Sequence, residues 1–169
     1  MADKRRLPVL SSNAPEGDEE PRPPWHWIGF GVVAIFGAWL PLAWLSAQVV
    51  RGLLARWFPG ASSPEEIASA FSEMSTEARV RLTMTMAVPH VLALALASFV
   101  GGYLVGRYGA STTRREPVLA GLFAGIVACV LTFGATGFSW APLVVPLVAA
   151  PMAGVGGGVG RRRAVVPTR

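Results

Sequence analysis

Four long runs of apolar residues follow one another along the chain, at about 28–50, 83–106, 117–138 and 141–159. A helix rises about 1.5 Å per residue, so runs of roughly 20 residues are long enough to cross the ~30 Å hydrocarbon core of a bilayer. The pattern predicts an all-α protein: an integral membrane four-helix bundle with its four spans at these positions.

The longest segment between two spans has a different periodicity. Ser63 followed by Pro64 and Glu66 is typical of a helix start, because serine caps the first amides and proline fits the first turn. We therefore expect a short extracytoplasmic amphipathic helix over about 64–80, lying on the outer membrane face or on the bundle. One stripe of this helix would be apolar, with residues at helical spacing: Ile67, Ala70, Phe71, Met74 and Ala78.

The two ends of the chain are polar. Residues 1–24 hold five prolines and show no apolar period, which is typical of a disordered tail, and residues 161–169 open with three arginines. We expect a transmembrane domain over 25–160 between two cytoplasmic tails. The first apolar run is too long for a signal peptide, so no cleavage is expected.

The distribution of basic residues predicts the orientation. With the N-terminus inside, eleven of the fifteen Lys and Arg residues lie on the cytoplasmic side, and four lie outside. Cytoplasmic loops carry the excess of positive charge in membrane proteins. We predict a multi-pass protein of the bacterial cytoplasmic (inner) membrane, N-in and C-in; the bacterial assignment follows from the short basic loops and the lack of a targeting segment.

Composition supports this class and excludes others. Apolar residues make up 52% of the chain and charged residues only 15%, against about a quarter in soluble domains. The net charge of +5 does not indicate nucleic-acid binding, because the basic residues cluster beside apolar runs. At those positions we expect them to meet anionic lipid headgroups.

Small residues recur every fourth position in the last three spans. Because lipid tails are as apolar as leucine, helices in a membrane associate where small residues let their backbones approach closely. The rows predict close helix packing inside one bundle. A second reading stays open, in which one row faces outward and binds another subunit, as a homo-oligomer or within a larger membrane complex. The predicted packing residues are Ser98, Gly102, Gly106, Gly121, Gly125, Ala149, Ala153 and Gly157.

Candidate chemistry within the spans is sparse. No span holds an acidic or basic residue away from its ends, whereas proton-coupled carriers and many cation pores need carboxylates at depth. We predict no catalytic, cofactor-binding or metal-ligating residue. His90 is the one titratable group at depth, about 10 Å below the outer surface by helical rise. Together with Gln48, Thr132 and Thr136 it forms a predicted intramembrane polar site, which either ties helices together or binds a ligand or proton.

The stretch GGYLVGRYG at 101–109, with the closing GGGVGRRR, resembles small multi-spanning bacterial membrane proteins of unknown function. Small multidrug-resistance transporters differ, because their first span carries a glutamate that this chain lacks. The hypothesis is therefore a non-enzymatic accessory or structural membrane subunit. The alternative is a small oligomeric transporter or channel with its polar site near His90.

Overall fold

The computed structural model describes residues 24–61, 63–109, 115–136 and 141–164, and of residues 24, 132–136, 141, 163 and 164 the backbone alone. Every element of secondary structure in this part of the chain is helical. The prediction of an all-α fold is thus confirmed. The elements are α1 (Pro24–Trp57), α2 (Pro64–Glu73), α3 (Thr76–Tyr108), α4 (Arg115–Thr136), the short 3-10 helix η1 (Ala141–Leu143) and α5 (Val144–Ala164).

Three helices are long and apolar enough to cross a membrane. They cover Trp25–Trp57, Thr76–Tyr108 and Val144–Arg162 among the described residues. Their apolar side chains are widely exposed; Val33 is 71% exposed and Leu147 74%. A soluble protein does not leave apolar surface on this scale to water, so the three helices support a multi-pass membrane protein.

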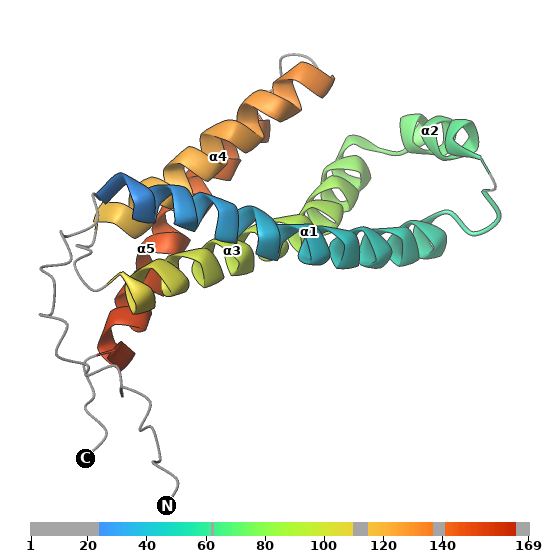
Figure 1. The fold of residues 1–169 in the computed structure, drawn as a ribbon. Helices are drawn as coiled ribbons and strands as arrows, with labels where there is room; N and C mark the ends of the chain where they lie inside the picture. The colour runs from blue at the N-terminus through green and yellow to red at the C-terminus, as the bar shows by residue number, and fades with distance from the viewer. Residues whose placement is uncertain (1–23, 62, 110–114, 137–140, 165–169) are drawn as a thin grey trace, which may run out of the picture.

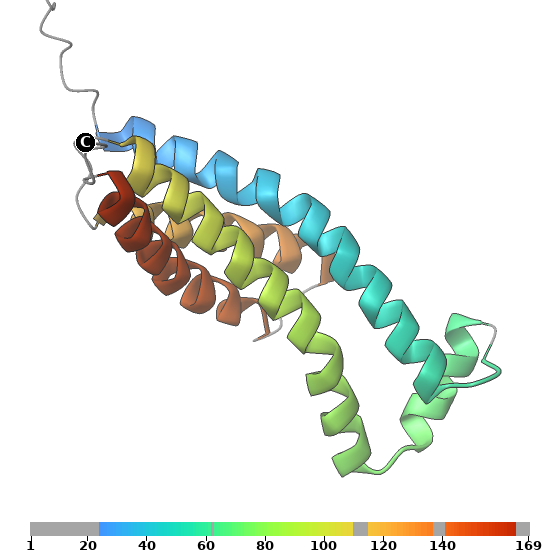
Figure 2. The same ribbon diagram turned by 90° about the horizontal axis from the view of Figure 1, so that it is seen from below.

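The helices form two pairs that cross. α3 lies along α1 on one side and packs against α5 on the other, while α4 packs on α5 and on α1 (Figures 1 and 2). α4 diverges from the later part of α1, toward the upper right of Figure 1. The beginning of α1 and the end of α5 lie at one end of the molecule, and α2 lies at the opposite end (Figure 1).

Helix length differs between the pairs. α1 has 34 residues and α3 has 33, whereas α4 has 22 and α5 has 21. At about 1.5 Å per residue, α1 and α3 are roughly 50 Å long, and α4 and α5 roughly 32 Å, close to the ~30 Å hydrocarbon core. α1 and α3 therefore extend beyond the shorter pair on the side where α2 lies (Figure 2).

The helix predicted over 64–80 is two helices in the structure. Its start is observed as expected, with the Ser63 hydroxyl accepting a hydrogen bond from the Glu66 amide at 3.2 Å. The helix ends at Glu73, because Met74 is extended, and Ser75 caps a new helix by accepting from the Ala78 amide at 3.3 Å. Residues 76–80 thus belong to α3, and Ser75 before Thr76 and Glu77 is the cap signal that the apolar stripe concealed.

Most of the remaining boundaries extend the predicted spans, whereas the span predicted over 141–159 begins with the 3-10 helix η1 before α5. The segments 28–50 and 83–106 lie inside α1 and α3, which are longer at both ends. Arg161–Arg163, assigned above to the tail, continue α5 as helix, in keeping with the good helix propensity of arginine. Residues 1–23, the turn at 137–140 and the end of the chain at 165–169 lie outside the described residues.

Candidate functional site

The closest helix contact joins α3 and α5 through small residues on both sides. A methyl group added at Gly102 would run into the backbone of Ala153, and one added at Gly106 would run into that of Gly157. The reverse also holds, since Gly156 and Gly160 of α5 lie against the α3 backbone at Phe99 and Tyr103. Only hydrogen fits at these positions, so the two helices touch backbone to backbone.

Helix α4 carries two neighbouring rows of small residues, Gly121 with Gly125 and Ala120 with Ala124, and the two rows face different helices. A Cβ at Gly121 would lie 2.5 Å from the Ala149 carbonyl oxygen of α5, and one at Gly125 would lie 2.5 Å from Pro146 Cα. The adjacent row faces α1, where a Cβ at Gly31 would lie 2.6 Å from the Ala120 methyl group. Both rows are therefore occupied inside the molecule.

The structure places all eight predicted packing residues in buried positions. Ser98, Ala149 and Ala153 have no exposed surface at all. The Ser98 hydroxyl has no hydrogen-bond partner among the described residues, so this serine fills space as a small side chain.

On the outward face of α1, two glycines lie next to open space and belong to a row of exposed residues. Gly29, Val33, Gly37, Leu40 and Trp44 follow one another at helical spacing and are all exposed. A methyl group added at Gly29 or Gly37 would have no neighbour within 4 Å. Between the larger side chains of this face, the backbone of α1 is open to whatever surrounds the protein.

A polar bridge joins α1 to α3. Ser46 Oγ donates to the Ala43 carbonyl oxygen at 2.8 Å and lies 2.8 Å from His90 Nδ1. The direction of the Ser46–His90 hydrogen bond depends on the tautomer of the imidazole. The His90 side chain is exposed overall.

The bridge lies near one boundary of the hydrocarbon layer. His90 is 17 residues from Arg107, or about 26 Å by helical rise, which is most of the ~30 Å core. Ser46 is five residues before Arg51, about 7 Å along α1. Arginines of both helices, Arg51 of α1 and Arg81 of α3, thus lie on the α2 side of the bridge, and the apolar body of the bundle lies on the other side.

The predicted polar site is only partly described. His90 is bonded to Ser46, which the sequence analysis did not single out, and the structure shows no bond between His90 and Gln48. Gln48 lies two residues beyond Ser46, about 200° around the helix. Thr132 and Thr136 are in the last turns of α4, where the side chains lie outside the described residues. Ser46 could not be found from the sequence, because a serine mid-helix carries no signal until the register of α1 against α3 is known.

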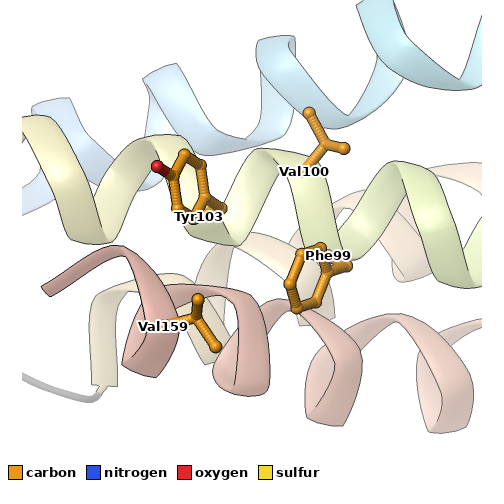
Figure 3. A pocket seen from close by; sticks show the side chains of 4 residues that line it. All are labelled: Phe99, Val100, Tyr103 and Val159. Carbon is orange, nitrogen blue, oxygen red and sulfur yellow. The ribbon is translucent and has the colours of Figure 1, made fainter. Parts of the chain in front are cut away.

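A shallow apolar notch of about 320 Å³ lies between α3 and α5, lined by Phe99, Val100, Tyr103 and Val159 (Figure 3). Phe99 and Tyr103 project from α3 beside Val159 of α5 (Figure 3). It lies beside the glycine contact described above, since Gly156 and Gly160 of α5 meet the backbone of Phe99 and Tyr103. Tyr103 supplies its one side-chain hydroxyl.

Comparisons with protein-family models, curated protein sequences and solved structures find no match to this chain. Among the described residues, no three His, Cys, Asp or Glu side chains come together as a metal site would require.

Proposed function

We propose that this protein is a non-enzymatic membrane subunit that packs, through the outward face of α1, against a transmembrane helix of another subunit. The observation that carries the proposal is the contrast between two kinds of glycine. Gly102 and Gly106 of α3 and Gly121 and Gly125 of α4 are in contact with α5, whereas Gly29 and Gly37 have open space beside them.

Glycine has a different effect on a helix that faces lipid and on a helix that faces another helix. Lipid chains pack as well on leucine as on glycine, so a helix that faces only lipid gains nothing from glycine, which costs about 1 kcal/mol relative to alanine. A contact with a partner helix does gain packing energy from glycine, because the two backbones can approach closely. Exposed Trp44, 66% accessible, and Leu40, 63% accessible, would flank that helix.

The finer architecture belongs to the same proposal. The chain crosses the inner membrane of a bacterium four times, with α4 as the third span, both termini in the cytoplasm and α2 outside. Supporting this, α1 begins and α5 ends at the same end of the molecule (Figure 1). Along the sequence, eleven of the fifteen Lys and Arg residues fall in the segments assigned to the cytoplasm, in keeping with the rule for cytoplasmic loops.

Co-purification tests the proposal with a matched pair of variants. Gly37 on α1 and Gly158 on α5 both have nothing within 4 Å of an added Cβ. The tagged protein, extracted in mild detergent, is expected to bring a stoichiometric membrane partner or a second copy, which mass spectrometry and size exclusion identify. Gly37→Leu should lose this partner while Gly158→Leu keeps it. If both variants retain the partner equally, the outward face of α1 is not the docking face.

A transporter or channel is the second candidate, on the strength of the exposed His90 beside Ser46. It needs the polar residues of several helices, or of several copies, to line one path. Flux assays in proteoliposomes decide it: a conductance or uptake that disappears in folded His90→Ala would favour this function over the subunit.

A further inference from the structure

An apolar groove of about 410 Å³ lies at the α2 end of the molecule, beyond the shorter helix pair. Three helices form it, and its deepest residues are Phe58, 8% exposed, and Leu82, 2% exposed. Ile67 and Phe71 bring the apolar stripe of α2 onto it. Its lining is Leu54 and Phe58 near the end of α1, Pro64, Ile67, Ala68 and Phe71 of α2, and Leu82, Thr83 and Met86 of α3.

Two arginines share the helix faces that line this groove. On α3, Arg79 precedes Leu82 and Met86 by three and seven residues, and on α1, Arg51 precedes Leu54 by three; such spacings fall on one face. The Nε atom of Arg79 is shielded from solvent and has no hydrogen-bond partner among the described residues. A shielded guanidinium donor without an acceptor is costly unless an anion completes it.

The acidic residues nearby are outside the lining of the groove, and Glu77 falls on the face of α3 that carries Arg81, four residues further on. Glu65, Glu66 and Glu73 are exposed on α2, and by helical spacing they fall on the side opposite Ile67 and Phe71. The groove therefore has a positive rim and an apolar floor, with negative charge on its outer wall.

The groove lies at the depth of a lipid headgroup. Arg79 is 28 residues from Arg107, about 42 Å along α3, and the bilayer with its headgroup layers is ~40–45 Å thick. Met86, at the membrane side of the lining, is about 10 Å closer to the hydrocarbon core. An acyl chain can enter the groove from the core, while its phosphate stays at the level of Arg79.

We propose that this groove binds one anionic phospholipid of the adjacent leaflet, with an acyl chain between α2 and the ends of α1 and α3 and its phosphate on Arg79. The lipid occupies the space beneath α2 and fixes that short helix, which has no buried residue of its own, against the long pair. This inference is independent of any partner at α1.

Native mass spectrometry of the purified full-length protein, titrated with phosphatidylglycerol or with phosphatidylcholine of the same chains, tests it. Wild type is expected to bind a first phosphatidylglycerol more tightly than the zwitterionic lipid. Arg79→Gln should weaken that first binding about fivefold, the effect of removing one arginine at a membrane surface. Arg81→Gln is the matched control; it lies two residues on, exposed and on the other face of α3, and should change affinity less than twofold.

A second pair of variants tests the acyl chain. Ala68 lines the groove yet is exposed, so Ala68→Trp fills the space from α2 without disturbing the core. It should abolish the first binding, while Ser72→Trp, on the same helix but outside the lining, should keep it. Equal losses in Arg79→Gln and Arg81→Gln would mean general surface charge, and full binding in Ala68→Trp would mean an empty groove. Equal affinity of wild type for both lipids would also overturn the proposal, as would displacement by soluble glycerol phosphate.

Discussion

At the scale of single residues, the Ser46–His90 bridge is a polar link between two long apolar helices, α1 and α3. Membrane helices gain less from such links than the apolar surroundings suggest, about 0.6 kcal/mol on average, because the unfolded chain in the membrane also finds partners. The bridge therefore fixes the register of α1 against α3 more than it stabilises the fold.

A double-mutant cycle measures this link. Ser46→Ala and His90→Ala should each lower the free energy of unfolding, and the pair should show a coupling of about 0.6 kcal/mol, at most ~1.7. Reversible unfolding in mixed micelles, followed by circular dichroism, gives the four values. Gln48→Ala serves as the control that should not couple with His90→Ala. Strict additivity of the Ser46 and His90 variants would contradict the bridge.

The sequence identified His90 at this site but not its partner. Composition and hydropathy point to a lone histidine at depth, because an ionisable side chain in an apolar run stands out from its neighbours. Gln48 is polar and was therefore predicted at this site, yet Ser46 lies on the face of α1 that meets α3. Two residues along a helix turn a side chain by about 200°, and only the packed structure settles which face is used.

At the scale of elements, the glycines divide by what lies beside them. An added methyl group at Gly102 must push α5 away, and overpacking of this kind costs about 1–3 kcal/mol. At Gly158 the same change meets nothing and should stabilise by up to about 1 kcal/mol through better helix propensity. Unfolding free energies of Gly102→Ala and Gly158→Ala should thus move in opposite directions. A parallel shift would show that the α3–α5 contact is looser than described.

The break between α2 and α3 depends on one cap. Ser75→Ala removes the acceptor for the Ala78 amide and should cost about 1 kcal/mol of local helix stability. Hydrogen exchange of the amides at 76–80 should then speed up about fivefold, read by mass spectrometry. Ser72→Ala, whose hydroxyl bonds only the Ser69 carbonyl within α2, should leave those amides unchanged. Unaltered exchange in Ser75→Ala would mean that α3 begins without help from the cap.

Element boundaries were predictable only where the sequence changes from apolar to polar residues. Apolar runs located the bodies of α1, α3, α4 and α5, because a run of that length has few other stable forms in lipid. Their ends were missed, since α1 and α3 continue as helices through residues polar enough to lie outside the hydrocarbon. Nothing in the apolar pattern near Met74 distinguishes one bent helix from two.

At the scale of the whole molecule, unequal helix lengths define which parts meet water. In a Cys129→Ala background, Glu73→Cys should react with a membrane-impermeant maleimide in intact cells, because α2 lies at the outer end in the proposed topology. Arg162→Cys should react only after permeabilisation. Leu147→Cys should react in neither case, since its exposed side chain faces lipid in the proposed topology. Labelling of both Glu73→Cys and Arg162→Cys in intact cells would contradict four crossings with both termini inside.

The two kinds of glycine also differ in what restrains their substitution during evolution. At Gly102 and Gly106 the fold itself forbids any side chain, so their retention among natural variants would report only the structure of this chain. Nothing within the chain opposes alanine, valine or leucine at Gly29 and Gly37. Those two positions are free to drift unless something outside the chain restrains them. If glycine were retained at position 37 in many natural variants, this would indicate that a partner contacts this face of α1 in all of them.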